Sequence, residues 1–183
     1  MSVLPIETAR LSLRLFSDAD LPVLVAILGD PEVMKLALYE RPLTPAEVRD
    51  FIDAEFAKSN EEIARLAVLC RKPEGAVIGF AGLLPCPYLP GELEFGFVLA
   101  AQEQGKGYAK EIALKLIEIG FGVLDRERLY ALCDPRNAPS RDVLSRKLQM
   151  HFVQEITTAD RGPRMVFEIT RQSWFESKPR TKA

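Results

Sequence analysis

The feature that most constrains the fold is a strand-like apolar segment that runs through a glycine-containing loop into a long amphipathic helix. Phe95 to Ala101 form the apolar segment, and the loop then reads Gln102-x-x-Gly105-x-Gly107. Two glycines at such a junction leave consecutive backbone N–H groups uncovered and directed along the helix axis. The helix dipole adds roughly half a positive charge there, and Lys106 adds another. The loop is therefore predicted to bind a phosphate group.

Two common phosphate loops do not fit this spacing. A Walker loop needs Ser or Thr after its Gly-Lys pair, whereas Tyr108 follows Gly107 here. A dinucleotide-binding fingerprint needs a third glycine where this chain has Lys110, and an acidic residue at the end of a second parallel strand. Asp125 and Glu127 lie near the right distance but before the next strand instead of after it.

The segment closely resembles a third type, the Q/R-x-x-G-x-G/A pyrophosphate loop of the GNAT N-acyltransferases, which Gln102, Gly105 and Gly107 satisfy. The resemblance extends over nearly the whole chain. It is nearest to the branch that includes the ribosomal-protein alanine N-acetyltransferases. Three strings carry it: residues 7–14 (ETARLSLR), residues 94–97 (EFGF) leading to residues 105–109 (GKGYA), and residues 137–140 (NAPS).

Composition limits the chain to one ordinary globular domain. Of its 183 residues, 48% are hydrophobic and 27% charged, so we expect a single domain over 1–176 and a polar tail over 177–183. A net charge of −2 gives no basic field for nucleic acid or an anionic membrane. Cys70, Cys86 and Cys133 are widely spaced, so we expect reduced core thiols and no metal site.

Location follows from hydropathy. No apolar run reaches the roughly 18 residues of a membrane span, and the N-terminus lacks a basic region followed by an apolar one. We expect a cytoplasmic protein without a membrane partner.

Hydrophobic periodicity predicts the order of the elements. A strand (residues 10–16) and two capped helices, which start at Ser17 and Thr44, come before three antiparallel strands at 64–70, 76–84 and 92–99. A helix after the loop, a strand at 129–133, a helix near Ser140 and a hairpin (151–156 and 165–170) follow. The resemblance implies an α+β fold in three layers. Its sheet is mixed and mostly antiparallel, has about seven strands, splays at a central parallel pair and carries helices on both faces.

The resemblance implies acetyl-CoA as the donor, with no metal. The splayed strands would leave backbone groups of Phe97, Val98 and Leu99 free to pair with pantetheine. Gln102 would brace the loop, and Asn137 and Ser140 would contact pantetheine and its sulfur. The pyrophosphate would lie on the N–H groups of Gln104, Gly105, Lys106, Gly107, Tyr108 and Ala109.

Glu94 is the preferred general base, because it lies on the strand face opposite Phe95, Phe97 and Leu99, beside an apolar slot that would raise its pKa. It could instead be solvated, or anchor the incoming ammonium. A backbone N–H near Phe97 or Val98 would serve the oxyanion. Ser140 and Asn137 would contact the departing thiolate, although a serine there is also a typical helix start.

Other polar and aromatic residues are assigned structural roles. His151 begins a predicted strand and is expected to be structural, and Trp174 and Phe175 are expected in the core or in a homodimer contact.

The chain departs from its apparent relatives near the late helix. Some branches have a tyrosine seven residues after the asparagine, where this chain has Leu144. Relatives usually end that helix with Lys-Leu-Gly, whereas Lys147-Leu148-Gln149 stands here one residue later. We therefore expect an inserted residue or an altered helix end that shifts the wall of the slot.

Together, these expectations predict an N-acetyltransferase. It would move an acetyl group from acetyl-CoA to a primary amine by direct attack in a ternary complex. The acceptor would be a protein N-terminus or a small-molecule amine, selected by the loops Leu36–Leu43 and Pro85–Gly91. Glu40, Glu92 and Glu94 would suit a cationic acceptor. The alternative is a non-catalytic acyl-CoA-binding regulatory module, and a nucleotide-dependent oxidoreductase is a remote third.

Overall fold

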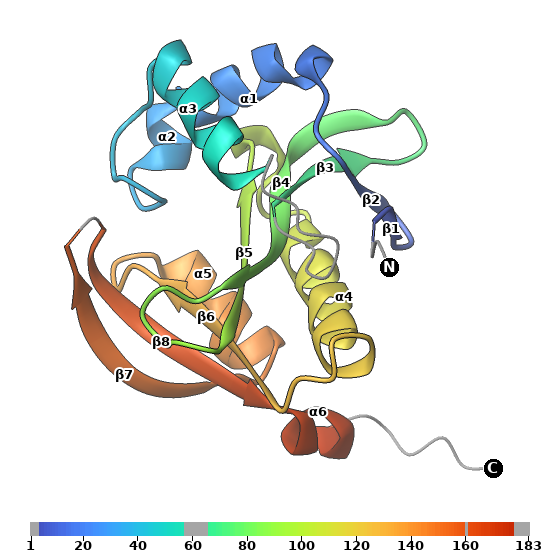
Figure 1. Ribbon diagram of the computed structural model, residues 1–183, viewed down its shortest axis with the longest axis vertical. Coiled ribbons are helices and arrows are strands. Elements are labelled where there is room, and N and C mark those ends of the chain that lie inside the picture. The colour runs from blue at the N-terminus through green and yellow to red at the C-terminus, as the bar shows by residue number, and fades with distance from the viewer. Residues whose placement is uncertain (1–3, 57–65, 160, 178–183) are drawn as a thin grey trace.

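A computed structural model describes residues 4–56, 66–159 and 161–177 of the chain (Figure 1). These residues form one eight-stranded sheet in the order β1-β2-β3-β4-β5-β6-β8-β7. The predicted mixed, mostly antiparallel sheet is confirmed, with one strand more than the expected seven. The additional strand, β1 (Ile6–Glu7), is two residues long, too short for a periodic pattern.

The N-terminal part follows its capping signals. After β2 (Leu11–Arg14), the Ser17 N–H donates to the Asp20 carboxylate (2.9 Å) around a short 3-10 turn, η1 (Asp18–Asp20). Helices α1 (Leu21–Leu28) and α2 (Pro31–Met34) follow. The Thr44 N–H donates to Glu47 (2.8 Å) to open α3 (Pro45–Glu55), as the capping box predicts.

The central strands form the expected antiparallel meander of β3 (Ala67–Arg71), β4 (Ala76–Pro85) and β5 (Leu93–Leu99). Residues 64 and 65, the predicted start of the first of these strands, lie outside the described residues. An ideal Cβ on Gly79 would lie 2.0 Å from the Val98 carbonyl oxygen, so glycine is needed where β4 and β5 approach each other.

A helical crossover joins β5 to its parallel neighbour. The chain passes through the 3-10 turn η2 (Ala101–Glu103) and helix α4 (Tyr108–Gly122) into β6 (Arg128–Cys133). Within the described residues the register of β5 and β6 holds a single pair, Glu94 opposite Tyr130. The two strands therefore diverge toward their C-terminal ends, as expected.

The C-terminal part completes the sheet. Helix α5 (Ala138–Asp142) continues into a π-helical turn, η3 (Val143–Lys147), and then come β7 (His151–Thr158), β8 (Gly162–Thr170) and α6 (Arg171–Ser177). The predicted closing hairpin is confirmed but its strands are longer than expected. Helix α6 was not predicted, and its Trp174 is buried beside Phe121 of α4, with ring centroids 6.4 Å apart.

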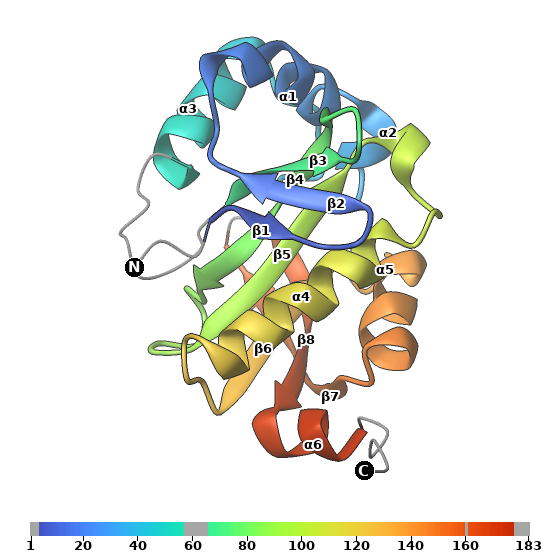
Figure 2. The same cartoon turned by 90° about the vertical axis from the view of Figure 1, so that its right-hand side faces the viewer.

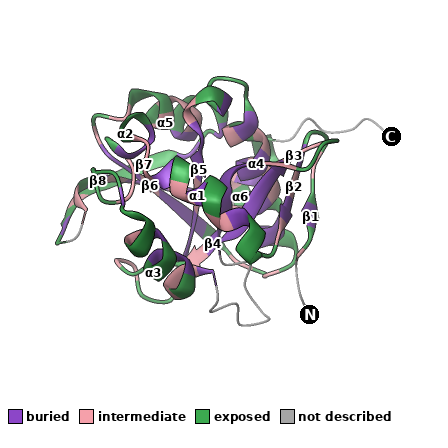
Figure 3. Cartoon of the chain, turned by 90° about the horizontal axis from the view of Figure 1, so that it is seen from above, coloured by how far each residue is buried: buried purple, intermediate pink, exposed green. Residues whose placement is uncertain are grey.

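Two apolar clusters hold the layers together. Ile112, Leu116 and their neighbours on α4 pack on one face of the sheet, which α4 crosses in Figure 2. Leu24, Phe51 and Phe80 belong to a second cluster between α1–α3 and the other face. Figure 3 shows buried strands between helices whose outer sides are exposed. No helix in the described part of the chain is both long and apolar enough to cross a membrane.

Candidate functional site

The loop before α4 presents a row of backbone N–H groups. Gly105 (φ +76°) and Gly107 (φ +84°) adopt the left-handed conformation that glycine tolerates best. Within the described residues, the N–H groups from Gly105 to Lys110 donate no hydrogen bond to the protein. They lie at the N-terminus of a 15-residue helix, where the dipole favours an anion.

Charged residues behind the loop fix its shape. Lys106 forms an ion pair with the buried Glu103 (3.0 Å), which also binds Arg71 (3.0 Å). Arg10 donates to the Lys106 carbonyl (3.0 Å), and its guanidinium lies 4.6 Å from the centre of the Tyr108 ring. The side chain of Lys106 is thus held by Glu103, outside the cavity that the loop borders.

A glutamine braces the loop, but not the one we expected. The Gln104 side-chain amide donates to the Leu99 carbonyl at the end of β5 (3.1 Å). Gln102 is exposed and, within the described residues, has no hydrogen bond from its side chain. The difference arises because residues 101–103 form a 3-10 turn that directs Gln102 outward.

The pairing register decides which backbone groups of β5 face the gap beside β6. Ala100 donates its N–H to Ile78 (2.9 Å), so alternate residues of β5, including Val98, direct their backbone groups toward β4. Phe97 and Leu99 face the diverging side. We expected all three residues to offer backbone groups, but the register excludes those of Val98. The Leu99 carbonyl is occupied by Gln104, which leaves both groups of Phe97 and the Leu99 N–H.

Two cavities meet at the divergence. A cavity of about 310 Å³ is bordered by the glycine loop, the start of α4 and η3, and includes Lys110 and Lys147. A second, of about 160 Å³, is lined by Glu94 and Gly96 of β5 and by residues 131–134 at the end of β6. Both are lined by Ala37, Phe97, Val98, Asn137 and Ser140. The two cavities are therefore neighbours that share one wall.

Glu94 is the buried acid of the smaller cavity. Its side chain is 8% exposed, and burial raises its pKa above the ordinary 4.5, opposed by the positive charge of Arg161 and by a hydrogen bond with Cys86. Burial also raises the pKa of the Cys86 thiol to about 11. The predicted alternation along β5 holds, because Phe95 and Leu99 belong to the cluster on the opposite face.

Asn137 and Ser140 lie where β6 ends and α5 begins. The Asn137 side chain accepts the Ser140 N–H (3.1 Å), so it caps α5 as well as lining both cavities. The Ser140 side chain is in hydrogen-bonding contact with the Cys133 thiol. Leu144, at the position where other branches have a tyrosine, is buried on the wall of the smaller cavity.

The irregular end of the late helix has a structural explanation. A π-helical hydrogen bond spans one residue more than an α-helical one, and in η3 the Leu148 N–H donates to the Val143 carbonyl five residues earlier (2.9 Å). Gln149 follows at φ +56°, the conformation for which glycine is usual after a helix. The one-residue displacement of Lys147-Leu148-Gln149 is thus absorbed as a π turn that borders the larger cavity.

Both loops expected to select the acceptor border the smaller cavity, through Leu36, Leu38 and Tyr88. Glu40 does not join them, because it binds Arg136 (2.9 Å) and Arg164 (3.5 Å). The buried Asp134 binds the same two arginines at 2.7 and 3.4 Å. Glu92 is also absent from the cavity wall, so Glu94 is the member of the predicted acidic trio that lines it.

Several predicted and unpredicted residues can now be placed. His151 is exposed on β7 and Phe175 is exposed on α6. The three cysteines are buried and free, and no group of three metal-ligating side chains occurs among the described residues. Sequence reasoning missed Arg161 at the cavity wall, because the hairpin that carries it is distant in sequence from Glu94.

Comparisons with known proteins agree with this geometry. A family model described as an acetyltransferase (GNAT) domain matches residues 10–148. An uncharacterized N-acetyltransferase of Bacillus licheniformis, p20, is 33% identical over 138 residues, which cover 75% of this chain and 78% of that protein.

Solved structures share the fold. A GNAT-family acetyltransferase from Bacillus anthracis superposes with a TM-score of 0.78 at 23% identity, covering 92% of this chain and 99% of the other. The aminoglycoside acetyltransferase AAC(6')-Ib, solved in complex with coenzyme A, superposes with a TM-score of 0.74 at 21% identity, covering 92% and 99%.

Proposed function

This chain belongs to the GNAT family of acetyltransferases, and we propose that it moves an acetyl group from acetyl-CoA to a primary amine by direct attack in a ternary complex. The observation that carries the proposal is the contact between two cavities at Phe97, Val98, Asn137 and Ser140. One cavity has the backbone donors that an anion needs, and the other has a buried acid. A donor and an acceptor can therefore meet across one wall.

The larger cavity suits acetyl-CoA, which supplies an activated acetyl thioester. The N–H groups from Gly105 to Lys110 would hold its pyrophosphate, and Lys110 and Lys147 on the cavity wall would add positive charge. The Phe97 carbonyl and the Leu99 N–H would pair with the pantetheine amides, in place of a neighbouring strand. A coenzyme A complex of a protein with the same fold supports this assignment.

The smaller cavity would have to accept the proton that the amine loses when it is acetylated. As the amine nitrogen bonds to the acetyl carbon, the carbon–sulfur bond breaks, the nitrogen loses a proton and the sulfur gains one. The Glu94 carboxylate would accept the amine proton, directly or through water, because its raised pKa brings it nearer the working pH. Ser140 would donate a hydrogen bond to the departing sulfur. The Phe97 N–H would stabilise the oxyanion, a contribution of about a hundredfold in rate.

Calorimetry with coenzyme A, followed by measurement of thiol release from acetyl-CoA with primary amines, tests the proposal. We expect saturable coenzyme A binding, and thiol release that depends on the amine and falls in Glu94→Gln and Ser140→Ala. Binding without turnover would instead support the non-catalytic module. The absence of binding would overturn the assignment of the loop.

A further inference from the structure

The turn between β1 and β2 lies against the start of α4, far away in the sequence (Figure 2). The Thr8 hydroxyl (2.7 Å), the Arg10 N–H (2.8 Å) and the Arg10 guanidinium (2.7 Å) all donate to the Glu111 carboxylate. Glu111 belongs to the first turn of α4, and its side chain is 18% exposed. The β1–β2 turn is therefore attached to the helix end that follows the glycine loop.

Arg10 extends this attachment to the loop itself. Its guanidinium also donates to the Lys106 carbonyl (3.0 Å) and lies 4.6 Å from the centre of the Tyr108 ring. An ideal Cβ on Gly107, between these two residues, would lie 3.4 Å from the same guanidinium. One arginine side chain thus lies against three consecutive residues of the loop while it binds Glu111 of the helix.

The hydrogen bond to the Lys106 carbonyl determines which way the next N–H group points. A trans peptide unit is planar, so its C=O and N–H groups point in opposite directions. The Lys106 carbonyl points toward Arg10, and the Gly107 N–H of the same peptide unit therefore points away from Arg10. Gly107 lines the larger cavity and Arg10 does not. Within the described residues the Gly107 N–H has no acceptor in the protein, so it is available to a ligand in that cavity.

Arg10 also balances a negative charge that would oppose an anion. Glu111 places a carboxylate in the first turn of α4, next to the N–H groups that we assign to the diphosphate. An unpaired carboxylate there would repel the diphosphate. The ion pair with Arg10 (2.7 Å) compensates this charge, and the Thr8 hydroxyl adds a further hydrogen bond.

We propose that Arg10 is a positioning residue for the acetyl donor. By holding the Lys106 carbonyl behind the loop and compensating Glu111, it directs the Gly107 N–H toward the diphosphate of coenzyme A. This inference rests on the proposed function. It gives a role in donor binding to the β1–β2 turn, which lines neither cavity.

Two ligands separate a role in diphosphate binding from a general structural role. Coenzyme A carries the diphosphate, whereas pantetheine has the thiol arm without it. Calorimetric titration measures the affinity for coenzyme A, and displacement of coenzyme A measures the affinity for pantetheine. The proteins compared are the wild type, Arg10→Gln, Arg10→Lys and the control Arg49→Gln.

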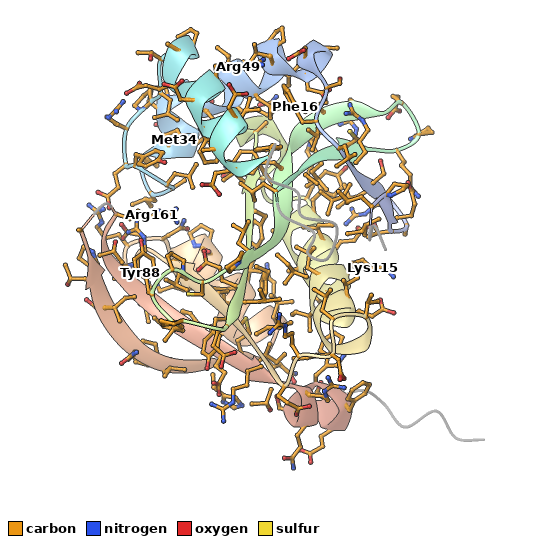
Figure 4. The ribbon with its side chains drawn as sticks, viewed as in Figure 1. Phe16, Met34, Arg49, Tyr88, Lys115 and Arg161 are labelled. Carbon is orange, nitrogen blue, oxygen red and sulfur yellow. The ribbon has the colours of Figure 1, made fainter. Side chains whose placement is uncertain are left out.

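Arg49 is a matched control for Arg10. The two side chains are similarly exposed, 45% for Arg49 and 48% for Arg10. Arg49 also binds carboxylates, those of Asp18 and Asp53. It lies on α3 near the top of Figure 4 and lines neither cavity. Because both arginines are partly exposed, neither substitution should leave a hole in the core.

Arg10→Gln should weaken coenzyme A binding about tenfold, because the charged hydrogen bond to the loop and the compensation of Glu111 are lost. The affinity for pantetheine should stay within about twofold of the wild type. Arg10→Lys should fall between Arg10→Gln and the wild type, since lysine keeps the charge but lacks the planar fork that reaches both acceptors. Arg49→Gln should match the wild type for both ligands. Urea unfolding verifies that each variant folds.

Either of two results would overturn the inference. If Arg10→Gln binds coenzyme A as tightly as the wild type, Arg10 does not position the loop. If Arg10→Gln loses affinity for coenzyme A and pantetheine equally, Arg10 supports the fold in general and not diphosphate binding. In both cases the wild type binds coenzyme A and the proposed function stands. A wild type that binds no coenzyme A would refute the proposed function and this inference with it.

Discussion

The thiol of Cys86 is in hydrogen-bonding contact with the carboxyl group of Glu94, at the junction of the β4–β5 loop and β5. A thiol with a pKa of about 11 stays protonated at neutral pH, so it can donate to the Glu94 carboxylate. Burial disfavours the ionised form of Glu94, whereas the Cys86 thiol and the charge of Arg161 favour it. The balance leaves the pKa of Glu94 raised, which bears directly on how activity should depend on pH.

Glu94→Gln should lower kcat/KM for the amine by about 10²- to 10⁴-fold, because the amide cannot accept the amine proton. Coenzyme A binding should not change, since Glu94 lies outside the larger cavity. In the wild type, activity should fall as the pH drops through a raised Glu94 pKa, above 4.5. Steady-state rates from pH 5 to 9 would show this limb.

Glu92→Gln is the matched control, because Glu92 lies two residues before Glu94, just before β5 begins, and does not line the cavity. Its rates and pH profile should equal those of the wild type. A Glu94→Gln variant with normal kcat/KM and an unchanged acidic limb would refute the role of Glu94 as the base.

Gly107→Ala should weaken coenzyme A binding about tenfold. A Cβ at φ +84° costs roughly 1–2 kcal/mol, so the loop would relax and misalign its N–H groups. Gly122→Ala is the control, because it lies at the other end of the same helix with no atom within 4 Å of an added Cβ. Calorimetric titration with coenzyme A compares the two. Equal affinities would argue against the loop as the binding site.

Gln149→Gly should stabilise the protein. Glycine relieves the strain of φ +56°, and after its larger loss of chain entropy the net gain is about 0.5–1 kcal/mol. Gln154→Gly, at an exposed strand position of β7, should instead destabilise it by a similar amount. Urea unfolding of both variants measures whether the free energy of unfolding rises in Gln149→Gly and falls in Gln154→Gly. A destabilised Gln149→Gly would contradict the described helix end.

Asp134→Asn should lower stability at pH 7 by about 3 kcal/mol, because it leaves the buried Arg164 without one partner. Arg136 and neighbouring groups lower the pKa of Asp134 from 3.8 to about 2. A lowered acid pKa contributes stability above pH 3.8 that is lost as the pH falls toward 2. The variant and the wild type should therefore converge on acidification.

Urea unfolding at several pH values from 7 to 2.5 checks this convergence. Asp50→Asn, at an exposed position on α3, should stay within about 0.5 kcal/mol of the wild type throughout. A constant difference between Asp134→Asn and the wild type would show that Asp134 contributes nothing to the acid dependence.

Many features of the fold could be predicted from short-range sequence patterns. Capping boxes at Ser17 and Thr44, the alternation along β5 and the spacing of Gly105 and Gly107 depend on neighbouring residues, so periodicity and turn chemistry reveal them. The one-residue displacement of Lys147-Leu148-Gln149 was also predicted from the sequence, although the π-helical turn that causes it was not. Helix α6 was not predicted, because seven residues with one buried tryptophan do not show a helical hydrophobic periodicity.

The smaller cavity was less predictable, because its wall comes from segments that are distant in sequence. Glu40 has the charge to bind an amine, yet tertiary contacts engage it with Arg136 and Arg164. The motif specifies Gln102 and leaves Gln104 unspecified, yet the 3-10 turn directs Gln102 outward and Gln104 is the residue that reaches Leu99. Such outcomes depend on the assembled fold and not on spacing.

The single residue pair between β5 and β6 has a consequence for how the molecule should respond to its ligand. Beyond Glu94, the described residues on the two sides of the sheet are joined through α4 and through side chains, without a ladder of main-chain bonds between β5 and β6. A donor lying in the gap would act as a substitute strand between them. Binding should therefore slow amide exchange in β5 and β6 together, as a single cooperative unit, and not at the contact residues alone.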